Sequence, residues 1–413
     1  MYQSFIILLG IATLFTLINT RFLKLPLTIG LMILGMTLSV VLLFVKNTYP
    51  ELFTSIPDIV HEIDFGDFLM NGILSFLLFA GAVHINLKEL KKERVPVFMF
   101  AIFGTILSTL IIGYLSFFVF GVLGINLSLL HCMLFGALIS PTDPIAVLGI
   151  FGHYHVRKDI SIKIEGESLF NDGIGIVIFL TVLSLIEGNN GGFSLSETSI
   201  LFLREAGGGI AFGVFIGWVA ILFLKQLKTD SDSSIMATLV VATGGYSLAN
   251  LIEVSGALAM VAAGLMIGNW VHKSAEMETR KFIIGFWKVI DSVFNSSLFV
   301  LMGMAIVLVD PTQVNILAAI FAIVIVLVGR FISVVIPYYL VDKRVKNFPW
   351  VNIKIVTIMT WSGLRGALAF ALALSIDKSE HGHFYIFLTY CVVAFSIIVQ
   401  GLTIPKLVKV LKM

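Results

Sequence analysis

The stretch EGESLFNDGIGIVIFLTVLSLI, residues 165–186, places three carboxylates directly against a run without charge. Glu165, Glu167 and Asp172 fall within nine residues, and the thirteen residues after Gly173 carry no charged side chain. A long apolar run is typical of a helix that crosses a lipid bilayer. Carboxylates are costly inside a membrane and usually serve a function there. The stretch therefore predicts a transmembrane helix that binds a travelling cation.

The composition extends this prediction to the whole chain. Of the 413 residues, 58% are hydrophobic and only 13% are charged, whereas soluble proteins carry about 25% charged residues. A soluble fold of this length could not bury so much apolar surface. We therefore predict an all-α polytopic membrane protein. The first apolar run lacks a basic leader and a small-residue cleavage site, so we expect a retained helix and not a signal peptide.

Thirteen segments are apolar enough to span a bilayer, which takes about 20 residues. They are residues 3–19, 27–45, 67–87, 95–119, 127–150, 162–186, 200–224, 234–252, 255–271, 284–308, 314–339, 352–376 and 384–405. The eighth and ninth are separated by little more than Glu253 and Val254. The expected fold thus has about 13 transmembrane helices.

The basic residues support this count and orient the chain. Lys and Arg collect on the cytoplasmic side of membrane proteins. Most of the 27 basic residues fall in the loops after odd-numbered spans or at the C-terminus, whereas the loops after even-numbered spans hold only Lys46, Arg204 and Lys378. We therefore expect a multi-pass protein of the inner (plasma) membrane, with its N-terminus outside and its C-terminus in the cytoplasm.

Thirteen spans divide naturally into two repeats of six and a linker. In one transporter unit over residues 1–413, repeat one would cover about 3–186, the linker about 200–224 and repeat two about 234–413. Because the linker is a single span, the second repeat begins on the opposite side of the membrane and is inverted relative to the first. Transporters of this kind bind their substrates near the midplane, on helices broken at corresponding positions. Spans five and twelve correspond, so both are expected to be broken.

Each of these two spans does carry a helix-breaking sequence. Span five contains SPTDP, residues 140–144, whose prolines remove backbone donors. Span twelve contains WSGLRG, residues 361–366, whose glycines each weaken a helix by about 1 kcal/mol relative to Ala. A broken helix has a positive N-terminal end and a negative C-terminal end, which Asp143 and Arg365 are expected to neutralise. A simple proline kink is the alternative, but the matching positions favour functional breaks.

Helical spacing divides the acidic stretch between two faces. Asp172 and Ser168 are four residues apart and share a face, and Glu165 lies two turns toward the cytoplasm on the same stripe. Glu167 is five residues from Asp172, roughly 140° around the helix axis. We expect Asp172 and Ser168 to line a cavity with Glu165 nearer its cytoplasmic mouth, while Glu167 points toward another helix.

Arg330, deep in span eleven, is the partner expected for Glu167 in a mainly structural ion pair. Asp172 is then left without a dedicated counter-ion, so burial favours its neutralisation by a proton or a cation. A structural acid bound by a neighbouring amide is the alternative for Asp172. A hard monovalent cation prefers oxygen ligands, and the candidates here are Asp172, Ser168, Thr142 and Asp143.

Two further polar residues, one next to Asp172 and one in span ten, are also assigned roles. Asn171 is expected to belong to the ion-binding site, where its amide hydrogen-bonds the break in span five without adding charge. Asp291 in span ten is interpreted as one half of an interface ion pair with Lys288, one turn away.

Together these motifs resemble those of the NhaP/NHE-type sodium–proton antiporters. The resemblance rests on SPTDP, EGESLFNDG and GLRGALAFALAL (363–374), and LTIGLMILGM (27–36), SGALAMVAAGLMIGN (255–269) and LFVLMGM (298–304) extend it over nearly the whole chain. It implies a homodimer with a dimerisation domain and a mobile core domain, and elevator-like alternating access. It also implies that Asp172 binds Na⁺ and H⁺ in competition, and that a Glu167–Arg330 pair forms.

The expected function is therefore exchange of Na⁺, or Li⁺, for H⁺. The Asn171–Asp172 pair resembles the electroneutral branch of the family and implies a 1:1 exchange. K⁺/H⁺ or broad cation/H⁺ exchange stays open, because no residue pattern decides the cation, and a cation channel is a further alternative. We expect membrane lipid around the protein, and no cofactor, no enzymatic activity, no metal beyond the transported cation and no nucleic-acid partner.

Overall fold

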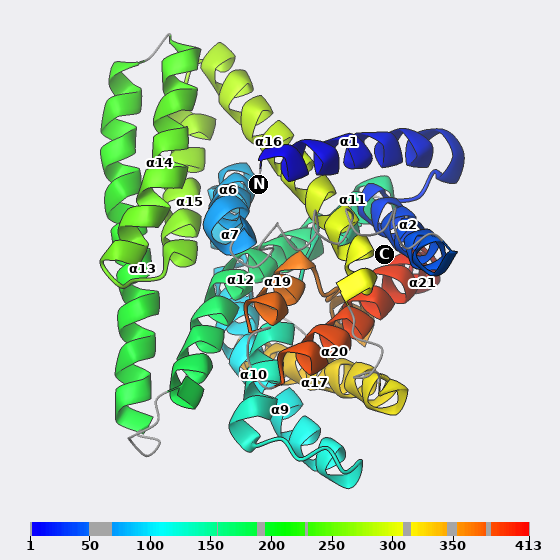
Figure 1. Ribbon diagram of the computed structural model, residues 1–413. Coiled ribbons are helices and arrows are strands. Elements are labelled where there is room, and N and C mark those ends of the chain that lie inside the picture. The colour runs from blue at the N-terminus through cyan, green and yellow to red at the C-terminus, as the bar shows by residue number, and fades with distance from the viewer. Residues whose placement is uncertain are drawn as a thin grey trace.

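The computed structural model describes residues 2–48, 68–154, 156–187, 195–227, 230–308, 315–344, 353–376 and 381–412. These residues are almost entirely helical (Figure 1), and their only extended pairing is one isolated bridge. The predicted all-α polytopic fold is therefore confirmed. Within the described residues, nine helices are long and apolar enough to cross a membrane.

Each of the thirteen predicted spans coincides with one helix or with a broken helix. The spans of the first half are α1 (Tyr2–Ile18), α2 (Leu27–Thr48), α6 (Leu74–His84), α8 (Arg94–Phe98) continuing into α9 (Thr105–Val122), α10 (Leu129–Ile139) with α11 (Ile145–Tyr154), and α12 (Lys158–Glu187). The later spans are α13 (Leu195–Gln226), α14 (Ser231–Leu251), α15 (Gly256–Ser274), α16 (Met277–Met304), α17 (Ile316–Arg344), α18 (Ile353–Trp361) with α19 (Ala367–Ser375), and α20 (Gly382–Phe395) continuing into α21 (Gly401–Leu411). A short helix, α7 (Leu87–Lys92), lies between α6 and α8.

Side-chain caps define several of the helix starts. The hydroxyl of Ser128 accepts a hydrogen bond from His131 N at the start of α10, 3.3 Å, and that of Ser255 accepts one from Leu258 N at the start of α15, 3.3 Å. Such caps satisfy backbone donors that have no partner within the helix. The Ser255 cap also separates α15 from α14, with Glu253 in the left-handed region at φ 58°. The predicted boundary between the eighth and ninth spans is thus confirmed.

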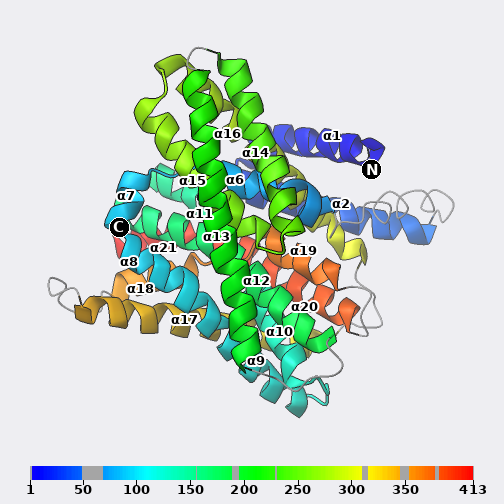
Figure 2. The ribbon, with the colours of Figure 1, turned by 90° about the vertical axis from the view of Figure 1, so that its left-hand side faces the viewer.

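Packing divides the helices into two groups that meet mainly at α12, with smaller contacts of α16 with α19 and of α2 with α11. In the first group α15 packs against α6 and α13, and α16 packs against α2 and α6. In the second group α9 packs against α10 and α17, and α20 packs against α17 and α19. The helix α12 contacts α10 of one group and both α13 and α15 of the other. Figure 2 shows α13 running in front of the molecule, with α12 beside it.

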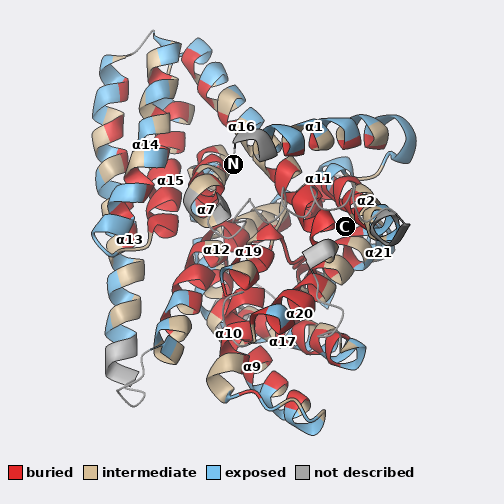
Figure 3. Ribbon diagram, in the orientation of Figure 1, coloured by how far each residue is buried: buried red, intermediate tan, exposed pale blue. Residues whose placement is uncertain are grey.

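Apolar side chains cover both the interior and much of the outer surface. Buried residues gather where the helices cross, whereas the outward faces of α1, α9 and α13 are exposed (Figure 3). Large apolar residues on these faces include Leu17, Phe118 and Phe215, each more than half exposed. Such helices, apolar on the outside as well as the inside, are suited to contact with lipid.

The two predicted breaks are present, and they touch each other. Residues 140–144 separate α10 from α11, and residues 362–366 separate α18 from α19. Asp143 and Leu364 form the isolated antiparallel bridge, in which Asp143 N donates to Leu364 O at 2.8 Å. The freed backbone of one break is therefore partly satisfied by the other, as non-helical backbone at membrane depth requires.

Candidate functional site

A cavity of about 220 Å³ lies where the broken helices meet α12. Its walls come from α6, from the break between α10 and α11, and from α12, α16 and α19. The polar residues among its lining are His84, Thr142, Asp143, Glu165, Ser168, Asp172, Asp291 and Asn295. Of the five residues expected at the ion-binding site, Asp172, Ser168, Thr142 and Asp143 line this cavity, whereas Asn171 is not part of its lining.

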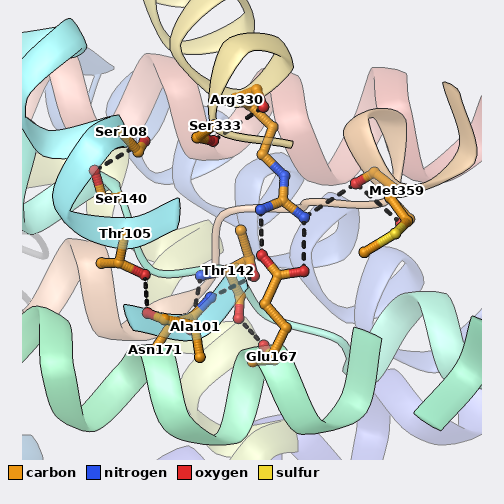
Figure 4. A network of polar contacts seen from close by, with 12 residues as sticks. Ala101, Thr105, Ser108, Ser140, Thr142, Glu167, Asn171, Arg330, Ser333 and Met359 are labelled. Atoms are coloured by element: carbon orange, nitrogen blue, oxygen red, sulfur yellow. Dashed lines mark hydrogen bonds and ion pairs between the residues drawn. The ribbon is translucent and has the colours of Figure 1, made fainter. Parts of the chain in front are cut away.

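The helix α12 divides its acids between two faces, as its spacing predicts. Glu165, Ser168 and Asp172 line the cavity, whereas Glu167 points away from it toward α17 (Figure 4). The hydroxyl of Ser168 donates a hydrogen bond to the carbonyl of Thr142. This bond holds α12 against the helix break at the level of the cavity.

Asn171, less than one helical turn from Ser168 on α12, binds the same break. Its Nδ2 donates to Thr142 Oγ1 at 2.9 Å, and Thr142 N donates to its Oδ1 at 3.3 Å. Both side chains are buried, and Figure 4 shows the two bonds side by side. Thr142 N lies in a broken segment without a helical partner, so the Asn171 amide replaces a lost backbone hydrogen bond.

The Glu167–Arg330 pair lies outside the cavity lining and joins α12 to α17. Arg330 Nη1 and Nη2 bind the two oxygens of Glu167, the Nη2–Oε2 distance being 3.1 Å. Glu167 is 1% exposed and Arg330 6%, so the ion pair is fully desolvated. Nη2 also donates to Met359 O at 3.0 Å, in the last turn before the second break. A Cβ added at Gly363 would overlap Arg330 Nε, so this glycine makes room for the guanidinium.

The charges in the two breaks lie at the helix ends that they can neutralise. Arg365 Nη1 donates to the carbonyls of Ser140 and Pro141, the latter at 3.1 Å, at the negative C-terminal end of α10. Asp143 Oδ1 accepts a hydrogen bond from Ile145 N, 2.9 Å, at the positive N-terminal end of α11. Both arrangements are favourable with respect to the helix dipoles.

Asp143 also lies against the start of α19. A Cβ added at Gly366 would be 2.5 Å from Asp143 Oδ2. The carboxylate of Asp143 is therefore positioned by the N-terminal regions of two half-helices, and only glycine permits this approach.

The expected pairing of Asp291 with Lys288 is wrong. Asp291 faces the cavity and accepts a hydrogen bond from Asn295 Nδ2 at 2.9 Å, while Lys288 is exposed. No ion pair joins the two among the described residues. Residues four apart on a helix share a face, and on α16 this face turns toward the cavity. Hydrophobic patterning gives no signal for this orientation, because α16 is apolar on several sides.

Comparisons with known proteins agree with this geometry. The family described as sodium/hydrogen exchanger, transmembrane, matches residues 9–410. The Na(+)/H(+) antiporter NhaP of Pseudomonas aeruginosa is 38% identical over 404 residues, covering 97% of this chain and 95% of the relative. The Na(+)/H(+) antiporter ApNhaP of Aphanothece halophytica is 33% identical, covering 97% of this chain and 72% of the relative.

A solved structure has the same fold. It is that of the sodium proton antiporter MjNhaP1 from Methanocaldococcus jannaschii at pH 8, with a TM-score of 0.76 over 100% of this chain and 99% of the other. The sequence identity is 22%, so the similarity concerns the fold alone.

Proposed function

Because this chain belongs to the sodium/hydrogen exchanger family and exchanges Na⁺ for H⁺ across a membrane, we propose that the carboxylate of Asp172 carries the two ions in turn. The observation that supports this most is the pairing pattern inside the protein. Glu167 is paired with Arg330, whereas Asp172 lines the cavity and forms no ion pair among the described residues. A carboxylate without a counter-ion is costly in a membrane interior and usually functional, and binding of a cation or a proton neutralises its charge.

The other ligands are oxygen atoms of Thr142 and Asp143 in the break of span five and of Ser168 on α12. The Thr142 carbonyl accepts one hydrogen bond from Ser168 and retains a second lone pair. The Ser168 hydroxyl donates its proton to this carbonyl, so its own lone pairs are available to a cation. Asp143 adds a carboxylate oxygen at the cavity wall. These oxygen ligands suit a hard monovalent ion such as Na⁺ or Li⁺. The side chain of Asn171 holds Thr142 in place by a hydrogen bond to its hydroxyl.

Competition for Asp172 makes the protein an exchanger. A cation or a proton neutralises the carboxylate, but the two do not bind together. Moving a bare charge through a dry interface is expensive, so the site crosses readily when it is loaded and poorly when it is empty. Glu167 stays compensated by Arg330 in both loaded states. One Na⁺ is therefore exchanged for one H⁺, and the cycle is electroneutral.

We further propose how the site moves and how the chain sits in the membrane. The group of helices that contains both breaks is the mobile core, and the group that contains α13–α16 is the dimerisation domain of a homodimer. In this proposal the N-terminus lies outside and the C-terminus in the cytoplasm of the inner membrane, which is supported by the concentration of Lys and Arg in alternate loops. The contact between the two breaks supports inverted repeats over residues 3–186 and 234–413.

Reconstituted vesicles test this proposal. The purified protein is placed in liposomes with an internal pH dye, and Na⁺, Li⁺ or K⁺ is added outside with and without a voltage clamp. We expect internal alkalinisation on addition of Na⁺ that is independent of voltage, and its loss in Asp172→Asn. The matched control is Asp159→Asn, on the same helix and outside the cavity. Exchange retained in Asp172→Asn would refute the site, and exchange that follows the voltage would refute the 1:1 stoichiometry.

A further inference from the structure

Two buried polar residues on the last span face the second break. Ser396 and Gln400 belong to a π-helical segment, Ser396–Gln400, between α20 and α21. Ser396 is 1% exposed and Gln400 3%. Polar side chains inside a membrane protein are expensive and usually mark function, and π-helical turns often occur at functional sites. Neither residue lines the cation cavity.

Their hydrogen bonds connect the two sides of the break. Ser396 Oγ accepts a bond from Arg365 N at 2.9 Å and donates to Gln400 Oε1 at 2.7 Å. Gln400 Nε2 donates to Trp361 O at 3.3 Å. Trp361 is the last residue of α18, and Arg365 lies in the linker before α19. The two side chains thus satisfy one carbonyl and one N–H that the break leaves without helical partners.

The direction of this chain of hydrogen bonds is fixed by its ends. Arg365 N can only donate and the Trp361 carbonyl can only accept. If the Gln400 amide were turned over, its oxygen would face the Trp361 carbonyl and two acceptors would be in contact. The chain therefore has one satisfied arrangement, which holds residues 361 and 365 at a set separation.

The same linker residues hold the first break. Arg365 donates from its guanidinium to Ser140 and Pro141, and the Leu364 carbonyl accepts from Asp143 N. A shift of residues 364–365 would therefore move residues 140–143, of which Pro141, Thr142 and Asp143 line the cation cavity.

We propose that Ser396 and Gln400 are positioning residues for cation binding, acting through residues 364–365 on the wall formed by Thr142 and Asp143. This inference rests on the proposed function, because the wall that the pair positions is the proposed cation site. Neither side chain touches the cation.

Substitutions that keep size and remove hydrogen bonds test the inference in the same vesicles. Gln400→Met and Ser396→Ala should each raise the apparent KM for Na⁺ by roughly fivefold to tenfold with a smaller change in the maximal rate. Ser396→Thr keeps the hydroxyl and should stay within about twofold of wild type. The matched control is Thr403→Val, because Thr403 binds Trp361 Nε1 at 2.8 Å from the same span but outside the break. Its apparent KM should not change.

The double variant Ser396→Ala/Gln400→Met separates positioning from general loss of structure. Both residues act through one chain of bonds, so the double variant should be no worse than the worse single variant. Effects that multiply, or melting temperatures that fall while the apparent KM stays at the wild-type value, would overturn the inference. If Gln400→Met does not accumulate, Ser396→Ala alone must still raise the apparent KM. Failure of the proposed function would give a different result from failure of this inference, because the Asp172→Asn variant would then still exchange Na⁺ for H⁺.

Discussion

Replacing Arg330 by alanine should be among the most damaging single changes in this protein. The guanidinium makes two hydrogen bonds to Glu167 and one to the Met359 carbonyl, in a site where both charged residues are buried. Removing one partner of a buried pair leaves an uncompensated charge and costs about 3–5 kcal/mol. With the unfolding entropy per residue of soluble domains, a chain of 413 residues would melt about 3–6 °C lower.

The assay is thermal unfolding of the purified protein in detergent, together with its yield from membranes. Glu167→Gln in the Arg330→Ala background removes the stranded charge, so the double variant should melt above the single Arg330→Ala variant. Arg330→Lys should rescue only partly, because an ammonium cannot bind both carboxylate oxygens in the bidentate geometry. A melting temperature of Arg330→Ala equal to that of wild type, or a double variant less stable than the single one, would refute the reasoning.

Three further predictions concern the cavity. Lowering the pH through the range in which Asp172 is protonated should raise the apparent KM for Na⁺ by about tenfold per pH unit at constant maximal rate, because the two ions compete for one group; a fall in maximal rate alone would contradict competition. Gly366→Ala should reduce exchange at least about tenfold, since its Cβ would lie 2.5 Å from Asp143 Oδ2, whereas Gly285→Ala, which meets no atom within 4 Å, should exchange like wild type. Asp291→Asn should raise the apparent KM for Na⁺ about threefold and leave the maximal rate unchanged, because it removes a charge from the cavity wall; an unchanged KM in vesicle assays would exclude that role.

The spans and their breaks were predictable because the bilayer imposes them. A membrane helix needs a long apolar run, and the clustered Pro and Gly residues of SPTDP and WSGLRG weaken two of these runs enough to break them, whereas the single Pro337 leaves α17 continuous. The division of α12 between Asp172 and Glu167 was predictable for a similar reason, since helical spacing alone sets the angle between two side chains. The partner of Glu167 followed because Arg330 is a deeply buried base in an otherwise apolar span.

Contacts between distant helices were not predictable in the same way. The bridge between Asp143 and Leu364 joins residues more than two hundred positions apart, and neither break alone indicates that it meets the other. Asp291 was assigned to the wrong partner because residues three apart on a helix are able to pair, but Lys288 is exposed whereas Asp291 faces the cavity and accepts a hydrogen bond from Asn295. Ser396 and Gln400 gave no signal, since two polar residues near the end of an apolar span also suit a helix end in water.

Proton release on cation binding tests the central role of Asp172 most directly. Na⁺ is titrated into the purified protein in weakly buffered detergent solution, and the protons released are counted with a pH dye across the physiological pH range. At low pH each bound Na⁺ should release close to one proton, and the number should fall as the pH rises, since Asp172 is then already deprotonated. Asp172→Asn should release none, while Asp291→Asn should still release protons. Release that is undiminished in Asp172→Asn, or Na⁺ binding without release at any pH, would contradict a single carboxylate shared between the two ions.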